Sequence, residues 1–406
     1  MAAVDGWCVG VHGRQAVAVA GESGARVRVV IAGGGFAAVE AALALRALAG
    51  TRAEMTLISP SSRFAYRPAA TAEVFGDTPP RAYDLEAIAG ELGAVCRRDR
   101  LEAVAPAKKS VRLASGARLE YDALILALGA RARTGVPGAL TFRDQRDAPR
   151  LRGLLRELEA LPVARLVFAV PSGCTWSLPI YELALLSCAF AAERNRKFEV
   201  TIVSPERTPL AVFGGEASRL VADLLAERGV RFVGGGAAHS VRRDSSLVVQ
   251  FDGEIEADGV VAVPQLHGNR VTGLPSSWSG FVPTDDCGRV EGLRDVYAAG
   301  DMTTYPIKQG GLAAQQADRI AQTIAAALGV PVREFRPVRV LGTRLLGGSH
   351  PLFLCVEIDA LGQPTAATLV HSETEHATSP AKVFGRYLTP YLEARERLGH
   401  MPRTPA

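Results

Sequence analysis

The chain of 406 residues lacks closely spaced cysteines. Its six cysteines stand far apart, and no CxxC or CxxxxC pair occurs. This spacing argues against a local redox dithiol and against a zinc site, so we predict no metal ion. The cysteines are residues 8, 96, 174, 188, 287 and 355.

The chain also has little excess of charge and no long apolar run. Its net charge of +4 is spread along the sequence, which excludes the basic footprint of a nucleic-acid-binding protein. No apolar run approaches the ~20 residues that a membrane-spanning helix needs. The start of the chain has no basic region, so we expect a poorly ordered extension over residues 1–26 rather than a signal peptide, and a cytoplasmic protein.

Composition allows more than one domain with a full core. Hydrophobic residues make up 48% and charged residues 22% of the chain, which are ordinary values for a globular protein. A chain of 406 residues has room for two or three domains.

The stretch VRVVIAGGGFAAVEAALALRAL, residues 27–48, reads as a buried strand, a glycine turn and a helix. It contains the pattern GxGxxA, formed by Gly33, Gly35 and Ala38. Gly33 permits the tight turn, Gly35 lets the backbone approach a pyrophosphate, and Ala38 keeps the helix close to the sheet. The helix N-terminus then faces the phosphates with its partial positive charge. This pattern predicts a dinucleotide-binding turn.

Two further segments repeat the same plan. AEMTLISP at 53–60 is echoed by FEVTIVSP at 198–205, and GARLEYDALILALGA at 116–130 is echoed by DGEIEADGVVAVPQ at 252–265. In each half a short polar hairpin feeds a buried apolar strand. The repeats predict two doubly wound α/β halves of one plan.

Neither half has the usual acidic residue for the ribose hydroxyls at the end of its second strand. Ser59 stands there in the first half, and a serine still donates and accepts hydrogen bonds. In the second half, Glu206 follows two residues after the strand and is a candidate substitute.

A third signature lies in DVYAAGDMTTYPIKQGGLAAQQADRIAQTIAAAL, residues 295–328. An apolar strand ends at Gly300 and Asp301, and a long amphipathic helix is predicted to start near Gly310. In this arrangement the carboxylate can hold a flavin ribityl chain, and the helix N-terminus can face the flavin N1–C2=O edge. Lys308, just before that helix, can assist.

Together, the GxGxxA turn, the strand LILALGA and the segment YAAGD…KQGGLAAQQA resemble the FAD-dependent pyridine nucleotide–disulfide oxidoreductase superfamily. The closer resemblance is to its branch of sulfide:quinone oxidoreductases, flavocytochrome c sulfide dehydrogenases and type II NADH dehydrogenases, and it covers roughly residues 27 to 390. FAYRPAATAEVFG at 64–76 fits the aromatic-x-aromatic-x-Pro stretch that this branch carries beside the isoalloxazine. A loop with core aromatics fits that stretch equally well.

The resemblance implies an α/β fold with two Rossmann-like, doubly wound, three-layer nucleotide-binding domains and a small C-terminal α+β segment. The FAD-binding domain comprises residues 27–145 and 265–330, and the second domain, 146–264, is inserted in it. Residues 331–406 lie over the flavin or at an interface. The residues predicted to bind FAD are Gly33, Gly35, Phe36, Ala37, Ser59, Arg67, Pro68, Ala127, Gly129, Gly300, Asp301, Lys308, Gln309 and Gly310.

The second half departs from the family at its turn, AVPSGCTWSLPIYE, residues 169–182. Only one glycine is present where type II NADH dehydrogenases need GxGxxG. Trp176 would crowd a pyrophosphate, and Pro171 and Pro179 stiffen the loop without donating N–H groups. Ordinary NAD(P)H binding is therefore disfavoured.

Resemblance to sulfide:quinone oxidoreductases implies catalytic roles for Cys174 and Cys355. Lys308 is a further catalytic candidate, because it stands just before the helix predicted to face the flavin. Two thiols that face each other across a flavin can form a disulfide, which sulfide attacks to give a persulfide, and each step needs a stabilised thiolate. Alignment from the Tyr-Glu end of the loop places Trp176, rather than Cys174, at the reactive position. The alternative is that both cysteines are small buried apolar residues.

The remaining candidates are less specific. His267 and His350 are candidate bases, and each also fits a surface or turn position. The segment SPAKVFGRYLTPYLEARERLG has helical spacing interrupted by Pro390. For this segment a packed helix or a homodimer contact is favoured over docking at a membrane surface.

Three functions remain open. The first is a flavoenzyme similar to sulfide:quinone oxidoreductase, with FAD as cofactor, sulfide or a small thiol as electron donor and a quinone-like acceptor. The second is an NAD(P)H-dependent flavin oxidoreductase with an aberrant nucleotide site. The third is a flavin-binding protein whose second domain is a platform for a partner or substrate, or a repurposed biosynthetic flavoenzyme.

Overall fold

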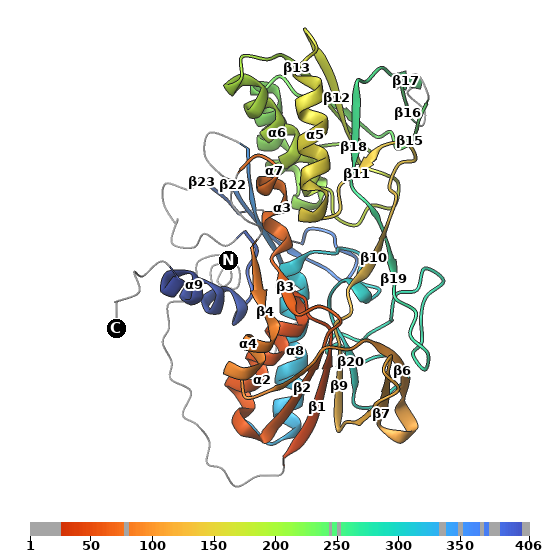
Figure 1. Cartoon of the computed structure of the whole chain (residues 1–406), viewed down its shortest axis with the longest axis vertical. Coiled ribbons are helices and arrows are strands. Elements are labelled where there is room, and N and C mark those ends of the chain that lie inside the picture. The colour runs from red at the N-terminus through yellow and green to blue at the C-terminus, as the bar shows by residue number, and fades with distance from the viewer. Residues whose placement is uncertain are drawn as a thin grey trace.

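Two sheets with flanking helices lie one above the other along the long axis of the molecule, and two connecting strands run between them (Figure 1). The predicted extension, apart from Arg26, and His350 lie outside the described residues. The computed structural model describes residues 26–76, 81–242, 246–249, 253–332, 338–347, 352–365, 369–372 and 382–399.

Five parallel strands form the first sheet, in the order β20-β9-β1-β2-β5. The central strand β1 is apolar and buried over its last four residues, as expected for a parallel sheet covered on both faces. The helix α2 is rich in alanine and leucine, which favour helix, and its small side chains allow close packing. The bounds are β1 Val27–Ala32, β2 Ala53–Ile58, β5 Val95–Arg97, β9 Ala123–Leu126, β20 Val296–Ala298, α2 Phe36–Ala49 and α8 Gly310–Ala327.

The second sheet repeats the strand order of the first as β11-β18-β12-β13-β14. The strands β12, β13 and β18 take the places of β1, β2 and β9, which confirms the two-fold plan predicted from the sequence repeats. Because β11 already belongs to this sheet, the second unit begins before the predicted boundary at residue 146. The bounds are β11 Leu140–Thr141, α5 Ala148–Leu158, β12 Ala164–Ala169, α6 Leu178–Glu193, β13 Phe198–Ser204, α7 Gly215–Glu227, β14 Arg231–Gly234 and β18 Gly259–Ala262.

Smaller elements complete each half. An antiparallel three-stranded sheet precedes β9 and another precedes β18, as the repeated polar hairpins predict. The strands β10 and β19 form an antiparallel ribbon that joins the two halves (Figure 1). The bounds are β3 Arg63–Ala65, η2 Arg67–Ala69, α3 Ala70–Glu73, β4 Ala82–Asp84, α4 Leu85–Glu91, β6 Leu101–Ala105, β7 Ser110–Leu113, β8 Arg118–Glu120, β10 Ala130–Arg133, η4 Gln145–Asp147, η5 Ala211–Phe213, β15 Ala238–Val241, β16 Leu247–Val249, β17 Gly253–Ile255, β19 Gln265–Gly268 and η6 Gly300–Met302.

The C-terminal part is the predicted α+β segment. Its strands form an antiparallel sheet, and side chains of the first two strands, among them Leu341 and Val356, share a core with the second domain. Leu388 and Leu392 of α9 join the core of the first domain. Pro390 lies in the first turn of α9, where a missing N–H is tolerated, so it marks the start of the helix and does not interrupt it. Of the described helices, none is both long and apolar enough to cross a membrane. The bounds are β21 Arg339–Leu345, β22 Leu352–Ile358, β23 Leu369–Ser372 and α9 Leu388–Gly399.

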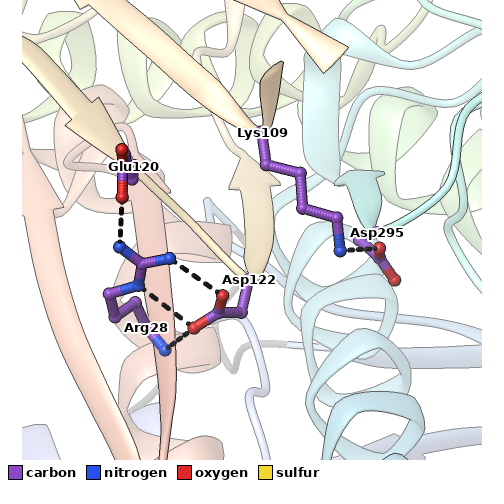
Figure 2. Close-up of polar contacts among 5 residues, drawn as sticks. All are labelled: Arg28, Lys109, Glu120, Asp122 and Asp295. Atoms are coloured by element: carbon purple, nitrogen blue, oxygen red, sulfur yellow. Dashed lines mark hydrogen bonds and ion pairs between the residues drawn. The ribbon is translucent and has the colours of Figure 1, made fainter. Parts of the chain in front are cut away.

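The same ion-pair cluster closes the N-terminal edge of both sheets. Figure 2 shows that Arg28 on β1 donates to both carboxylate oxygens of Asp122 and to Glu120. Arg165 on β12 makes the equivalent bonds to Asp258 and Glu256. These arginines are about half exposed, so each pair contributes little stability but fixes the strand register.

The C-terminal helix begins on a buried carboxylate of α2. Glu40 is fully buried and accepts hydrogen bonds from the backbone N–H groups of Tyr387, at 3.0 Å, and Leu388, at 2.7 Å. The first N–H groups of a helix have no partner within the helix, and Glu40 supplies one for α9. Burial raises the pKa of Glu40 to about 7 although these backbone bonds oppose the shift.

This raised pKa predicts a pH dependence of stability. The pKa of a free glutamate is 4.5, so the folded protein favours protonated Glu40, and that stabilisation is fully present below pH 4.5 and lost as the pH rises to about 7. We expect the unfolding free energy of the wild type to fall by about 3 kcal/mol relative to Glu40→Gln across this window. Chemical denaturation at several pH values measures the difference. Glu86→Gln, an exposed helical control, should follow the wild type, and a Glu40→Gln profile parallel to the wild type contradicts the prediction.

Candidate functional site

The predicted dinucleotide turn lies between β1 and α2, and its glycines are required by packing. Gly33 has φ 140°, and a Cβ on it would lie 2.1 Å from the carbonyl oxygen of Ala127. A Cβ on Gly34 would lie 2.6 Å from Oγ of Ser59. Gly35 differs, because nothing lies within 4 Å of its Cβ position. Neighbouring residues therefore pack tightly against Gly33 and Gly34, whereas the space at Gly35 is open. At Gly35 the helix α2 starts without a side-chain cap, so its backbone N–H groups are available to a pyrophosphate.

A second helix N-terminus, that of α8, approaches the same place. A Cβ on Gly300 would lie 3.2 Å from Cβ of Ala313 on α8 and 3.6 Å from Cβ of Ala37 on α2. The backbone N–H of Gly300 donates to Oε1 of Gln316 at 2.6 Å. The two helices therefore converge at the end of β20, beside Asp301. This cradle of two positive helix ends fits the phosphates and flavin edge of FAD.

Charged side chains gather at this convergence. Burial raises the pKa of Asp301, while the positive charges of Lys308 and Arg67 act against the shift. Burial lowers the pKa of Lys308 to about 8, against the influence of Asp301. The Nζ atom of Lys308 donates to the backbone oxygens of Thr303 and Tyr305. The structure thus brings together the predicted residues Asp301, Lys308 and Arg67, which would hold the ribityl chain and flavin edge.

The other predicted cofactor residues surround the same place. Gln309 begins α8, where its Oε1 accepts from Leu312 N–H at 2.9 Å, and Gly310 lies against the Phe36 ring. Ser59 is buried at the end of β2, and Gly129, with φ 66°, precedes β10. Ala127 packs on the glycine turn and Pro68 lies in η2. Their individual contacts with FAD stay predictions.

The aromatic stretch after β2 lies beside this cradle. The ring of Phe36 packs 5.3 Å from that of Phe64 and 5.4 Å from that of Tyr66, between ring centres. Phe64 and Tyr66 are buried. The stretch therefore supplies core aromatics and also borders the predicted flavin site, so its two interpretations are compatible.

The second half lacks a tight turn at the equivalent point. In the first half only residues 33–35 separate β1 from α2, whereas residues 170–177 separate β12 from α6. This longer loop lies against the approach to α8, since the backbone N–H of Lys308 donates to the oxygen of Thr175 at 3.3 Å. By its length and its contact with Lys308, the loop could line one side of the predicted flavin site. It lacks the short glycine turn that a pyrophosphate needs.

Both candidate residues of this loop pack into the second domain. Cys174 and Trp176 lie against its hydrophobic core, and the ring of Trp176 meets that of Phe213 edge-on at 6.1 Å. Burial, together with the negative charge of Glu206, raises the pKa of Cys174 to about 11. The thiol therefore keeps its proton at neutral pH, which is the opposite of the thiolate that the paired-cysteine mechanism needs.

Glu206 has internal partners. It accepts from the Tyr181 hydroxyl at 2.7 Å and from the Ser204 hydroxyl at 3.0 Å, and burial raises its pKa. A group held in this way is not presented to a ribose. Its candidate role as a substitute ribose ligand remains a prediction that this geometry does not favour.

Cys355 lies on the strand β22, buried and opposite Gly342 of β21. The carbonyl oxygen of Gly342 accepts from Nε2 of Gln309, the N-cap residue of α8, at 3.1 Å, so the strand partner of Cys355 is bonded to the residue that caps α8. Cys355 is disulfide-bonded, whereas Cys174 is a free thiol. A disulfide between Cys174 and Cys355, as the paired-cysteine hypothesis envisages, is therefore wrong for this structure, because Cys174 is a free thiol.

Sequence reasoning missed a buried ion pair that joins three segments. Lys382 of the C-terminal part donates to the carboxylate of Glu182 on α6, and both side chains are almost completely buried. The Thr71 hydroxyl donates to the same carboxylate at 2.8 Å, and Lys382 also donates to the oxygen of Pro68 at 2.7 Å. The only sequence signal for this buried ion pair is that Lys382 directly precedes the apolar residues Val383 and Phe384.

Two glycine substitutions separate folding from cofactor binding. Gly33→Ala should destabilise the protein even without FAD, because its Cβ would meet the Ala127 carbonyl. Gly35→Ala should leave the melting temperature of the FAD-free protein within a few degrees of the wild type but weaken FAD binding by about tenfold or more, because the methyl group fills the space left for the ligand. Thermal unfolding and FAD titration measure the two effects. Equal FAD affinity in Gly35→Ala and the wild type would show that the cradle lies elsewhere.

Comparison with known proteins agrees with this geometry. The family model of pyridine nucleotide-disulphide oxidoreductases matches residues 27–327. The sulfide-quinone reductase of Aquifex aeolicus is 25% identical over 297 residues, which cover 68% of this chain and 69% of that protein. Its solved structure superimposes with a TM-score of 0.75 and 21% identity over 91% of this chain and 90% of that one.

A second relative is named for a different electron donor, NAD(P)H. The alternative NAD(P)H-ubiquinone oxidoreductase C1 of Arabidopsis thaliana is 27% identical over 369 residues, covering 77% of this chain and 69% of that protein. The family model spans most of the chain, and the two helix ends form the cradle that its cofactor needs. The chain therefore belongs to the pyridine nucleotide-disulphide oxidoreductase family and is an FAD-dependent oxidoreductase.

Proposed function

We propose that the protein takes two electrons from sulfide or a small thiol and passes them to a quinone. The proposal is supported by the similarity to a sulfide-quinone reductase over about two thirds of both chains. The residues around Gly35, Asp301 and the start of α8 would hold FAD. When bound, FAD supplies the acceptor for the two electrons.

The observation that carries the proposal is the loop 170–177. It replaces the short glycine turn that would bind a nicotinamide dinucleotide, and Trp176 is packed against Phe213 within it. The loop also bonds to Lys308 through the oxygen of Thr175. Because the loop provides no pyrophosphate site, it favours a small electron donor over a nicotinamide dinucleotide.

We assign the reaction with the donor to Cys355. A donor thiolate attacks the Cys355 sulfur of the disulfide, so that a bond between the donor sulfur and Cys355 forms as the old S–S bond breaks. The displaced sulfur leaves as a thiolate and carries the electron pair. The donor sulfur is thereby oxidised and the displaced cysteine sulfur reduced. A second donor thiolate would release the first as a disulfide and leave two cysteine thiolates, and their re-oxidation would supply the electron pair that bound FAD accepts. The strand partner of Cys355 is bonded to Gln309, which keeps this chemistry beside the positive end of α8.

The quinone acceptor would meet a buried charged pair beside the cradle. Glu182 and Lys382 form this ion pair, and Lys382 also donates to the oxygen of Pro68, next to the aromatic stretch. The pair would hold α6, the aromatic stretch and the C-terminal part together around the bound acceptor.

The test is anaerobic reduction of the FAD-loaded protein, followed by the flavin absorption band. We expect sulfide or a small thiol to bleach the band rapidly and a soluble quinone to restore it. Cys355→Ser should slow bleaching by about a hundredfold, because it removes the attacked sulfur. Cys174→Ser should change the rate less than about threefold, because that thiol is protonated and packed in the core. Cys287→Ser, at a free cysteine outside the site, serves as the control.

Oxidation of NAD(P)H is the second candidate, and the Arabidopsis thaliana relative favours it. The same experiment separates the two functions. Bleaching by NADH or NADPH that is unaffected in Cys355→Ser contradicts the sulfide or thiol assignment and supports the nicotinamide donor.

A further inference from the structure

The ribbon that joins the two halves presents polar side chains on one face. In its antiparallel register Arg131 lies opposite His267, and Arg133 lies opposite Gln265. Side chains directly opposite each other share a face, and alternate residues of one strand share it too. Arg131, Arg133, Gln265 and His267 therefore lie on one face, and the other carries only small or apolar side chains: Ala130, Ala132, Leu266 and Gly268.

This face borders an open cleft of about 640 Å³. Thr141 at the end of β11 and Arg143 line the cleft from the second domain. The volume falls in the usual range of small-molecule sites, and it is far larger than a hydrosulfide ion requires. The full lining is Ala132, Arg133, Thr134, Thr141, Arg143, Gln265 and His267.

The cleft is lined by two arginines, of which one, Arg133, has no carboxylate partner among the described residues. Its lining contains no acidic side chain. Arg143 is neutralised by Asp147, to which its Nε and Nη2 atoms donate, but in the part of the chain that the structure describes no carboxylate pairs with Arg133. Arg131 donates from Nε to the amide oxygen of Asn269, which is neutral. The N–H groups of an exposed guanidinium can donate paired hydrogen bonds to the oxygens of a carboxylate or a phosphate.

The cleft also adjoins the flavin side of the molecule. The strand β10 begins directly after Gly129, whose oxygen accepts from Nδ2 of Asn269 at 3.0 Å. The side chain of Gln265 donates to the oxygen of Ser172 at 3.0 Å, in the loop that replaces the second glycine turn. A molecule seated here touches the ribbon and lies next to that loop.

We propose that this cleft binds the anionic oxygen group, a carboxylate or a phosphate, of the small thiol that donates electrons, with Arg133 as its principal ligand. This inference rests on the proposed function and narrows the donor to a thiol with an anionic group. Gln265 and Thr134 add neutral donors beside the guanidinium.

Binding can be tested without any redox reaction. Titration calorimetry of the FAD-loaded full-length protein with succinate and with inorganic phosphate should show saturable binding of at least one of them, and none of the uncharged succinamide. Succinate alone would identify a carboxylate site and phosphate alone a phosphate site. Arg133→Ala should weaken that binding by about tenfold or more, whereas Arg118→Ala, which removes the same charge at an exposed position on β8, should leave it unchanged. Absence of binding to the wild type, or equal binding to Arg133→Ala, overturns the proposal.

A kinetic comparison links the cleft to the donor. Mercaptosuccinate should bleach the flavin faster than uncharged 2-mercaptoethanol does, and Arg133→Ala should remove that preference. An equal rate for the two thiols in the wild type overturns the assignment of the cleft to the donor. If neither thiol nor sulfide bleaches the flavin while an anion still binds through Arg133, the proposed function fails and the anion site stands.

Discussion

The contact between the first glycine turn and the strand β9 is the constraint on which the site depends. The backbone of Gly33 lies so close to the carbonyl of Ala127 that no side chain fits between them. This contact brings the start of α2 down onto the sheet. Gly300 makes a similar approach from β20, between Ala37 and Ala313, and allows α8 to begin beside α2. Two positive helix ends then lie close together, and nothing lies within 4 Å of the Cβ position of Gly35 at the start of α2.

The second half of the chain keeps the sheet but changes the turn. Its strand order and its arginine–aspartate cluster repeat those of the first half, so the scaffold is the same. The connection from β12 to α6 is a longer loop whose tryptophan packs against the domain core, edge-on to Phe213. The same fold can carry different sites. A domain whose fold commonly binds a dinucleotide can therefore serve instead to border the predicted flavin site. In the proposed function the loop shapes access to the flavin, and its backbone oxygens bond to Gln265 of the ribbon and to Lys308 before α8.

Local features of this protein could be predicted from the sequence. The glycine turn, the repeated strands and the start of α8 at Gly310 follow from short patterns, since each depends on neighbouring residues. The fold class and the family follow from the order of these patterns along the chain. Asp301 and Lys308 could be placed for the same reason, because both shortly precede the start of one helix.

Features that depend on distant segments could not be predicted. The Glu182–Lys382 pair joins residues 200 positions apart, and no local pattern specifies such a contact. The shared face of Arg131 and His267 depends on the register of two strands that are far apart in the chain. The burial of Cys174 was missed because a cysteine before a helix suggests an activated thiolate, whereas the tertiary packing raises the pKa of this one.

The central claim is that the second domain has kept the dinucleotide-binding fold without the dinucleotide site. Equilibrium titration of the FAD-loaded protein with NADH and NADPH tests it most directly. The account predicts no saturable binding of either nucleotide up to about 1 mM, the upper end of common substrate affinities. Saturable binding at micromolar concentrations, weakened by substitutions in the loop 170–177, would contradict it.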